Sequence, residues 1–169
     1  MPGSESLAPS ADGALLFVAT PVMGIPPDPA ASYAVQVIDV GTDAVVDTIS
    51  ALAAPCPVHV TANSLLVGQW RFGDVGSPLR AGLLSIYDAI SFAPLDRIEV
   101  GAGPINIVST PDGALGFVSN LQSGTVSVVD IDNAAVTATL EVDRGNDLPL
   151  DRSIPNQNAH GMAYIPAVA

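Results

Sequence analysis

The stretch Leu7-Ala-Pro-Ser-Ala-Asp-Gly-Ala-Leu-Leu-Phe-Val18 recurs later in the chain as Ile107-Val-Ser-Thr-Pro-Asp-Gly-Ala-Leu-Gly-Phe-Val118. Both copies contain Asp-Gly-Ala-Leu followed by Phe-Val. Two further elements occur three times each, and every copy of the first of them ends in aspartate. They are Val35–Asp39, Leu84–Asp88 and Val126–Asp130, followed by Ala44–Ile49, Ala93–Ile98 and Ala135–Leu140. Self-similarity at a period near 45 residues indicates an array of similar structural units.

Each unit is predicted to contain four short strands. In the third copy these lie over 105–110, 114–119, 125–130 and 136–142. Alternating apolar residues and β-branched side chains favour half-buried strands, and Asp-Gly supplies the positive φ of a tight hairpin turn. The fold class is therefore all-β, with four-stranded antiparallel units in one domain over 1–169. The repeats lie at about 4–50, 51–100 and 101–143, and 158–169 supplies a first strand only, over 160–166.

The third copy also carries a set of short motifs at fixed places. These are Val100-Gly-Ala-Gly-Pro104, Pro111-Asp-Gly113, Phe117-Val-Ser-Asn120 and Thr125-Val-Ser-Val-Val-Asp130. The pattern resembles the YVTN-family β-propeller repeat, and the resemblance covers most of the chain apart from three loops. It implies a β-propeller of four-stranded blades, here three blades plus one extra strand, so a partial or half propeller. The repeat is specific for fold and nearly silent on function.

A propeller closes with about four to eight blades, and an open arc leaves sheet faces and strand edges exposed to water. We therefore expect the ring to be completed by a second copy of the chain, as a homo-oligomer, or by the remaining part of a longer propeller. The last strand, 160–166, would pair with strands supplied elsewhere.

Charge and composition exclude several classes of partner. The chain has 17 acidic residues, five arginines, no lysine and a net charge of −12, so this acidic protein should repel nucleic acid and anionic membrane surfaces. No apolar run is long enough for membrane insertion. The single cysteine excludes an internal disulfide and a thiolate zinc cluster. The localisation is cytoplasmic if Met1 is the true start, and periplasmic or secreted if the chain is part of a longer precursor.

The connections between strands are short at one end of each blade and long at the other. In an up-and-down blade, the loops after the second and fourth strands share one face of the propeller. Every long connection is of this kind: 20–32, 69–82 and 143–158. Binding residues concentrate on elaborated loops, so this long-loop face is predicted to bind a protein or a small-molecule ligand.

Five residues on this face are candidates for binding: His59, Asn106, His160, Trp70 and Arg71. Ser6, His59 and Asn106 are expected at equivalent positions where first strands begin, with His160 one residue off. Two histidines at the mouth of a central channel would suit a metal or acid–base chemistry. The resemblance implies the alternative that a histidine here hydrogen-bonds between blades. Trp70 and Arg71 are common anchor residues in protein contacts, or Trp70 caps the hydrophobic layer.

The leading hypothesis is a non-catalytic scaffold or binding module with no cofactor and no metal. Cys56 is interpreted as a buried thiol rather than a nucleophile. The segment Asp143-Arg-Gly-Asn-Asp147 lacks the full pattern of a calcium loop. The alternative hypothesis is an enzyme, or a cofactor-associated dehydrogenase-, lactonase- or lyase-like subunit, with a histidine-containing site at the channel mouth.

Overall fold

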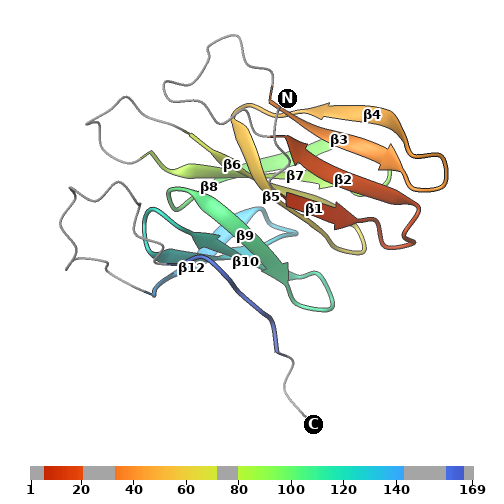
Figure 1. The fold of residues 1–169 in the computed structure, drawn as a ribbon. Coiled ribbons are helices and arrows are strands. Elements are labelled where there is room, and N and C mark those ends of the chain that lie inside the picture. The colour runs from red at the N-terminus through yellow and green to blue at the C-terminus, as the bar shows by residue number, and fades with distance from the viewer. Residues whose placement is uncertain (1–5, 21–32, 72–79, 143–158, 166–169) are drawn as a thin grey trace.

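The computed structural model describes residues 6–20, 33–71, 80–142 and 159–165. These residues form twelve strands in three antiparallel sheets, and each sheet takes its four strands in chain order (Figure 1). The prediction of an all-β propeller built from four-stranded blades is thereby confirmed, with three blades present. No helix in the described ranges is long and apolar enough to cross a membrane.

The three sheets are the three blades. The first contains β1 (Ser6–Pro9), β2 (Leu15–Thr20), β3 (Ala34–Asp39) and β4 (Ala44–Ser50). The second contains β5 (Ala54–Val60), β6 (Ser64–Trp70), β7 (Gly82–Asp88) and β8 (Pro94–Val100). The third contains β9 (Pro104–Ser109), β10 (Leu115–Asn120), β11 (Thr125–Asp130) and β12 (Ala135–Glu141).

The short turns repeat the same chemistry in different blades. In the β1–β2 turn the Ser10 hydroxyl donates to Asp12 at 2.6 Å, and in the β9–β10 turn Thr110 donates to Asp112 at 2.5 Å. The glycine after each aspartate has a φ of +73°, which only glycine adopts without strain. These hydrogen bonds lower the pKa of both aspartates. The Asp-Gly signal thus specifies two of the hairpins locally.

The hydrophobic core lies between neighbouring sheets. The second sheet has a blade on each side, so both of its faces are buried. Phe17, Val35 and Val37 of the first sheet pack against Leu65 and Val67 of the second. The opposite face of the second sheet packs on the third in the same way. That second cluster consists of Leu66, Leu84, Ile86, Val100, Ile107, Val118, Val129 and Ile131.

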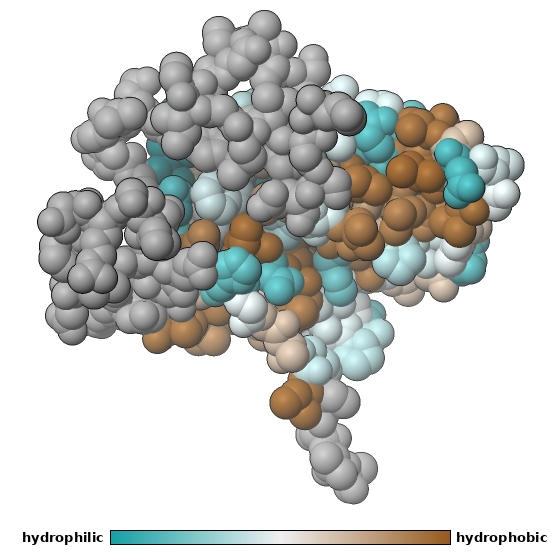
Figure 2. Space-filling model, viewed as in Figure 1, coloured by the Kyte–Doolittle hydropathy of each residue, from teal (hydrophilic) through white to brown (hydrophobic). Residues whose placement is uncertain are grey.

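The two end faces of the arc carry the same apolar pattern as the interior. Strand pairing makes Phe117 the counterpart of Phe17, but Phe17 is fully buried between sheets whereas Phe117 is partly exposed on the outer face of the third sheet. At the other end, Leu7 corresponds to the buried Ile107 and is 59% exposed. Figure 2 shows hydrophobic side chains gathered over the first sheet, where β2 to β4 lie. Both end faces therefore have the composition of blade interfaces.

The strand predicted over 160–166 is expected to pair with strands supplied elsewhere, and that pairing stays a prediction. Residues 159–165 have no regular secondary structure, because a strand needs hydrogen-bonding partners and the arc has no fourth blade to supply them. The segment nevertheless lies on the outer face of the third sheet. Tyr164 stacks on Phe117 with ring centroids 6.4 Å apart, and the Ser119 hydroxyl donates to the carbonyl of His160 at 3.3 Å.

Candidate functional site

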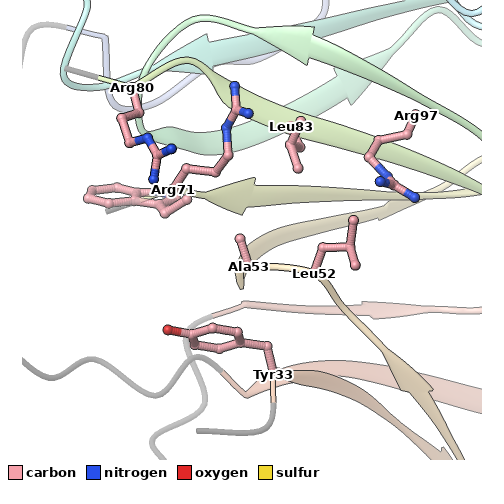
Figure 3. A pocket seen from close by; sticks show the side chains of 8 residues that line it. Tyr33, Leu52, Ala53, Arg71, Arg80, Leu83 and Arg97 are labelled. Carbon is pink, nitrogen blue, oxygen red and sulfur yellow. The ribbon is translucent and has the colours of Figure 1, made fainter. Parts of the chain in front are cut away.

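A pocket of about 500 Å³ opens between the first and second blades. Most of its lining comes from connections after second or fourth strands, the class that makes up the long-loop face. Its cationic residues are Arg71, Arg80 and Arg97, and its aromatic residues are Tyr33 and Trp70. Leu52, Ala53 and Leu83 complete it. We call these eight residues the arginine pocket. Figure 3 shows Arg71, Arg80 and Leu83 on the side of the second sheet and Tyr33 on the facing wall.

Arg71 is held in place by two contacts of its guanidinium group. Its Nε donates to the carbonyl of Ala81 at 2.5 Å, and its Nη2 pairs with the Glu99 carboxylate. Arg71 follows β6, Ala81 precedes β7 and Glu99 lies on β8, so the side chain links the two described ends of the β6–β7 connection to β8. Its guanidinium is therefore oriented by contacts within the protein itself.

The floor of the pocket depends on one buried amide. Gln69 is fully buried at the end of β6, and its Oε1 accepts hydrogen bonds from the backbone N–H groups of Leu52 at 2.9 Å and Ala53 at 3.0 Å. Its Nε2 donates to the Ser85 hydroxyl at 2.6 Å. Since Leu52 and Ala53 lie in the connection between β4 and β5, this side chain fixes the linker between two blades against the second sheet.

Trp70 contributes to the pocket and also contacts the third blade. It lines the arginine pocket, and its indole Nε1 donates to the carbonyl of Pro104 at 2.5 Å, at the start of β9. The side chain is half-buried. Trp70 therefore joins the second blade to the third while one part of it contributes to the pocket wall. Trp70 and Arg71, two of the five predicted binding residues, thus lie in the same cavity.

A second hollow of about 400 Å³ continues the groove between the first two blades. It shares Leu52 and Arg97 with the arginine pocket, and Asp47 lies in its lining. The groove consequently has arginines at one end and a carboxylate farther along.

The structure corrects the position expected for His59. Pairing between strands makes Pro55 the counterpart of Pro104, so His59 corresponds to Val108 rather than to Asn106. The prediction aligned Pro57 with Pro104, because the sequence alone does not show which proline opens the strand. The Nε2 atom of His59 lies 2.9 Å from the hydroxyl of Ser109 in the next blade. Burial lowers the pKa of this imidazole, which favours its neutral form.

The two histidines are not brought together. The side chain of His59 contacts Ser109 on the inner face of the third sheet, whereas the carbonyl of His160 contacts Ser119 on its outer face. Asn106 pairs with Ser119 and shares that outer face. His160 is exposed to solvent. Within the described ranges, no three histidine, cysteine, aspartate or glutamate residues group so as to hold a metal ion.

Two other features considered from the sequence are Cys56 and the segment 143–147. Cys56 is a buried thiol in β5. The segment 143–147, considered as a calcium loop, lies outside the described residues, as does most of each long connection.

Sequence reasoning missed Tyr33, Arg80 and Arg97 as residues of one site. They are distant in the chain and meet because Tyr33, in a connection of the first blade, faces Arg80 in a connection and Arg97 on β8 of the second blade. One signal was available: with no lysine in the chain and only five arginines, each cation is unusual. Three of these five arginines line the one pocket.

No family model matches the sequence, and no curated protein matches it either. Among solved structures, the chain is similar to Kuenenia stuttgartiensis hydrazine synthase, with 21% sequence identity and a TM-score of 0.64. The similarity covers 82% of this chain and 36% of that chain, so this chain spans about a third of the length of the structure it matches. At this identity the likeness concerns the fold alone, and it supports the propeller architecture.

Proposed function

We propose that the chain is a non-catalytic propeller scaffold that binds a partner or small ligand through its long-loop face, and that its repeat is of the YVTN type. The carrying observation is the arginine pocket, which lies on that face and combines oriented cations with aromatic and aliphatic walls. Ligand sites are commonly apolar concavities with a few placed polar groups. The contrast with His59, whose imidazole is engaged between blades, favours this pocket over the channel mouth.

Nuclear magnetic resonance with a small-molecule fragment library tests the proposed face. Fragments of mixed charge should shift the amide signals of Leu52, Ala53 and Leu83, whereas the short turns at Gly13 and Gly113 should stay unchanged. Shifts confined to the short-turn end would contradict the proposal.

The enzyme alternative has its own test, the double substitution His59→Ala and His160→Ala. If a stoichiometric metal or a measurable turnover disappeared in this variant, the non-catalytic proposal would be wrong.

We further propose that the scaffold works as a closed ring, completed by a second copy or by the remaining part of a longer propeller. Two features support this. The outer face of the third sheet presents Val108 and Phe117 where the first sheet buries Ala8 and Phe17 against its neighbour. The outer face of the first sheet presents Leu7, whose counterparts Val58 and Ile107 are buried in the other two sheets. A head-to-tail contact between such faces would repeat the existing interface between blades.

The mass in solution tests completion by a second copy. Light scattering should give twice the chain mass of 17.1 kDa, and Phe117→Asp should return the protein to a monomer, because a buried unpaired charge opposes association. The control is Ile90→Asp, at a residue that is 87% exposed on a turn, and it should leave the mass unchanged. A folded wild-type monomer at all concentrations would exclude the second copy.

A further inference from the structure

We infer that the arginine pocket binds an organic oxyanion, a small molecule with a carboxylate or phosphate group on an apolar body. This inference rests on the proposed function, since it assigns a ligand class to the same pocket. It concerns a cavity between two blades that the chain itself supplies, so it does not depend on how the ring is completed.

The distribution of charge is the first support. In a chain with a net charge of −12 and no lysine, solubility comes from the carboxylates, so arginines are not needed for it. Arg71, Arg80 and Arg97 nevertheless line a single pocket, and none of its lining residues in the described part of the chain is acidic. Like charges at one site repel each other, and an anion bound among them would offset that repulsion.

The state of the three guanidinium groups is the second support. Arg71 pairs with Glu99, the one ion pair among the described residues. Arg80 and Arg97 lie on exposed positions, and no carboxylate of the described ranges pairs with either. Within the described ranges, one arginine is thus oriented and partly neutralised, while the positive charge of the other two is not offset by an ion pair. Planar guanidinium groups match the two oxygens of a carboxylate or phosphate, and such charge-assisted bonds are stronger than neutral ones.

The walls define the rest of the ligand. Leu52 is 63% exposed beside the arginines, and Leu83 and Tyr33 provide further apolar surface. The volume of about 500 Å³ is that of a small-molecule site. From Leu52 and Arg97 the groove continues toward Asp47, whose carboxylate would repel a second negative group. The pocket therefore favours a molecule that is anionic at one end and apolar along its body, and a nucleic acid strand does not fit this description.

Titration calorimetry with three related probes tests the inference. The probes are 3-phenylpropionate, phenyl phosphate and the uncharged 3-phenylpropanamide. We expect one or both oxyanions to bind and the amide to bind at least roughly tenfold more weakly, because it lacks the charge that the guanidinium groups recognise. The carboxylate and phosphate arms show which oxyanion is preferred.

The test variant is the double substitution Arg80→Gln and Arg97→Gln, which leaves Arg71 and its structural contacts in place. It should lower oxyanion affinity roughly tenfold or more. The double substitution Arg80→Lys and Arg97→Lys keeps the charge and removes the planar fork, so it should retain part of the affinity. The control Thr137→Glu with Thr139→Glu lowers the net charge by the same amount on the exposed strand β12, and it should bind like the wild type.

Two results would overturn the inference. One is equal binding of the amide and the oxyanions at the arginine pocket, which would leave the proposed binding face intact. The other is oxyanion binding that Arg80→Gln with Arg97→Gln does not weaken. If, in addition, the amide signals that fragments shift lay only at the short turns, both the proposed binding face and the inferred oxyanion ligand would be wrong.

Discussion

Replacing Phe17 with alanine should destabilise the protein by about 3–5 kcal/mol, the largest effect we expect from one side chain. Phe17 is fully buried between the first and second sheets. Its ring meets that of Phe92 edge to face, with centroids 5.4 Å apart and an interplanar angle of 82°. The truncation removes this contact and leaves a cavity at a blade interface that cannot collapse without moving a sheet. Urea unfolding followed by circular dichroism measures the change.

The matched control is Phe117→Ala, the same substitution at the corresponding position of the third blade. Phe117 is partly exposed and stacks on Tyr164, so its loss should cost only about 1–2 kcal/mol when the chain is monomeric. A rise of this cost with protein concentration would be expected if a second copy covers that face. Equal costs for the two variants in dilute solution would contradict the buried interface described for Phe17.

Gln69→Leu should cost about 2–4 kcal/mol, although the two side chains have similar size. Leucine cannot accept the hydrogen bonds from the N–H groups of Leu52 and Ala53, nor donate to Ser85. Each buried polar group left without a partner costs about 1–3 kcal/mol. The same unfolding measurement detects the loss.

Gln36→Leu is the control for this prediction. Gln36 lies half-buried on β3, and from the described residues its amide oxygen accepts one long side-chain hydrogen bond, of 3.4 Å from Thr48. A substitution at such a position should change stability by less than about 0.5 kcal/mol. If Gln69→Leu were equally mild, the amide would not be what holds the linker between the first two blades.

The blades themselves could be predicted because their signals are local. The Asp-Gly turns at 12–13 and 112–113 require residues that adopt positive φ, and the alternation in Val35–Asp39 requires one buried face. In the third copy, the predicted strand over 125–130 coincides with the observed strand, and the other three differ by one residue at their ends. The strand expected over 160–166 stays a prediction for a nonlocal reason, since none of the three described sheets pairs with residues 159–165.

The candidate site likewise contains residues that could be predicted from local sequence and residues whose places depend on contacts between strands. Trp70 and Arg71 were predicted as binding residues because they are adjacent at the start of a long connection. Both line the arginine pocket. His59 was assigned to the wrong strand position because Pro55 and Pro57 read alike in the sequence, and only pairing with β6 distinguishes them. The two histidines considered for a metal or for acid–base chemistry at the channel mouth are not brought together, since the side chain of His59 contacts the inner face of the third sheet and the carbonyl of His160 contacts its outer face.

The repeat pattern in the chain was thus sufficient for the fold class, the four-stranded blades, the three-blade count and the two unequal ends of each blade. These properties follow from hydrophobic periodicity and turn chemistry, which act over a few residues. The tertiary structure alone decided that Tyr33 and Arg97 share a pocket, that Ser109 receives His59, and that Phe17 is buried while Phe117 faces outward. Such facts depend on which blade stands beside which, and contacts between blades join residues that no local pattern links.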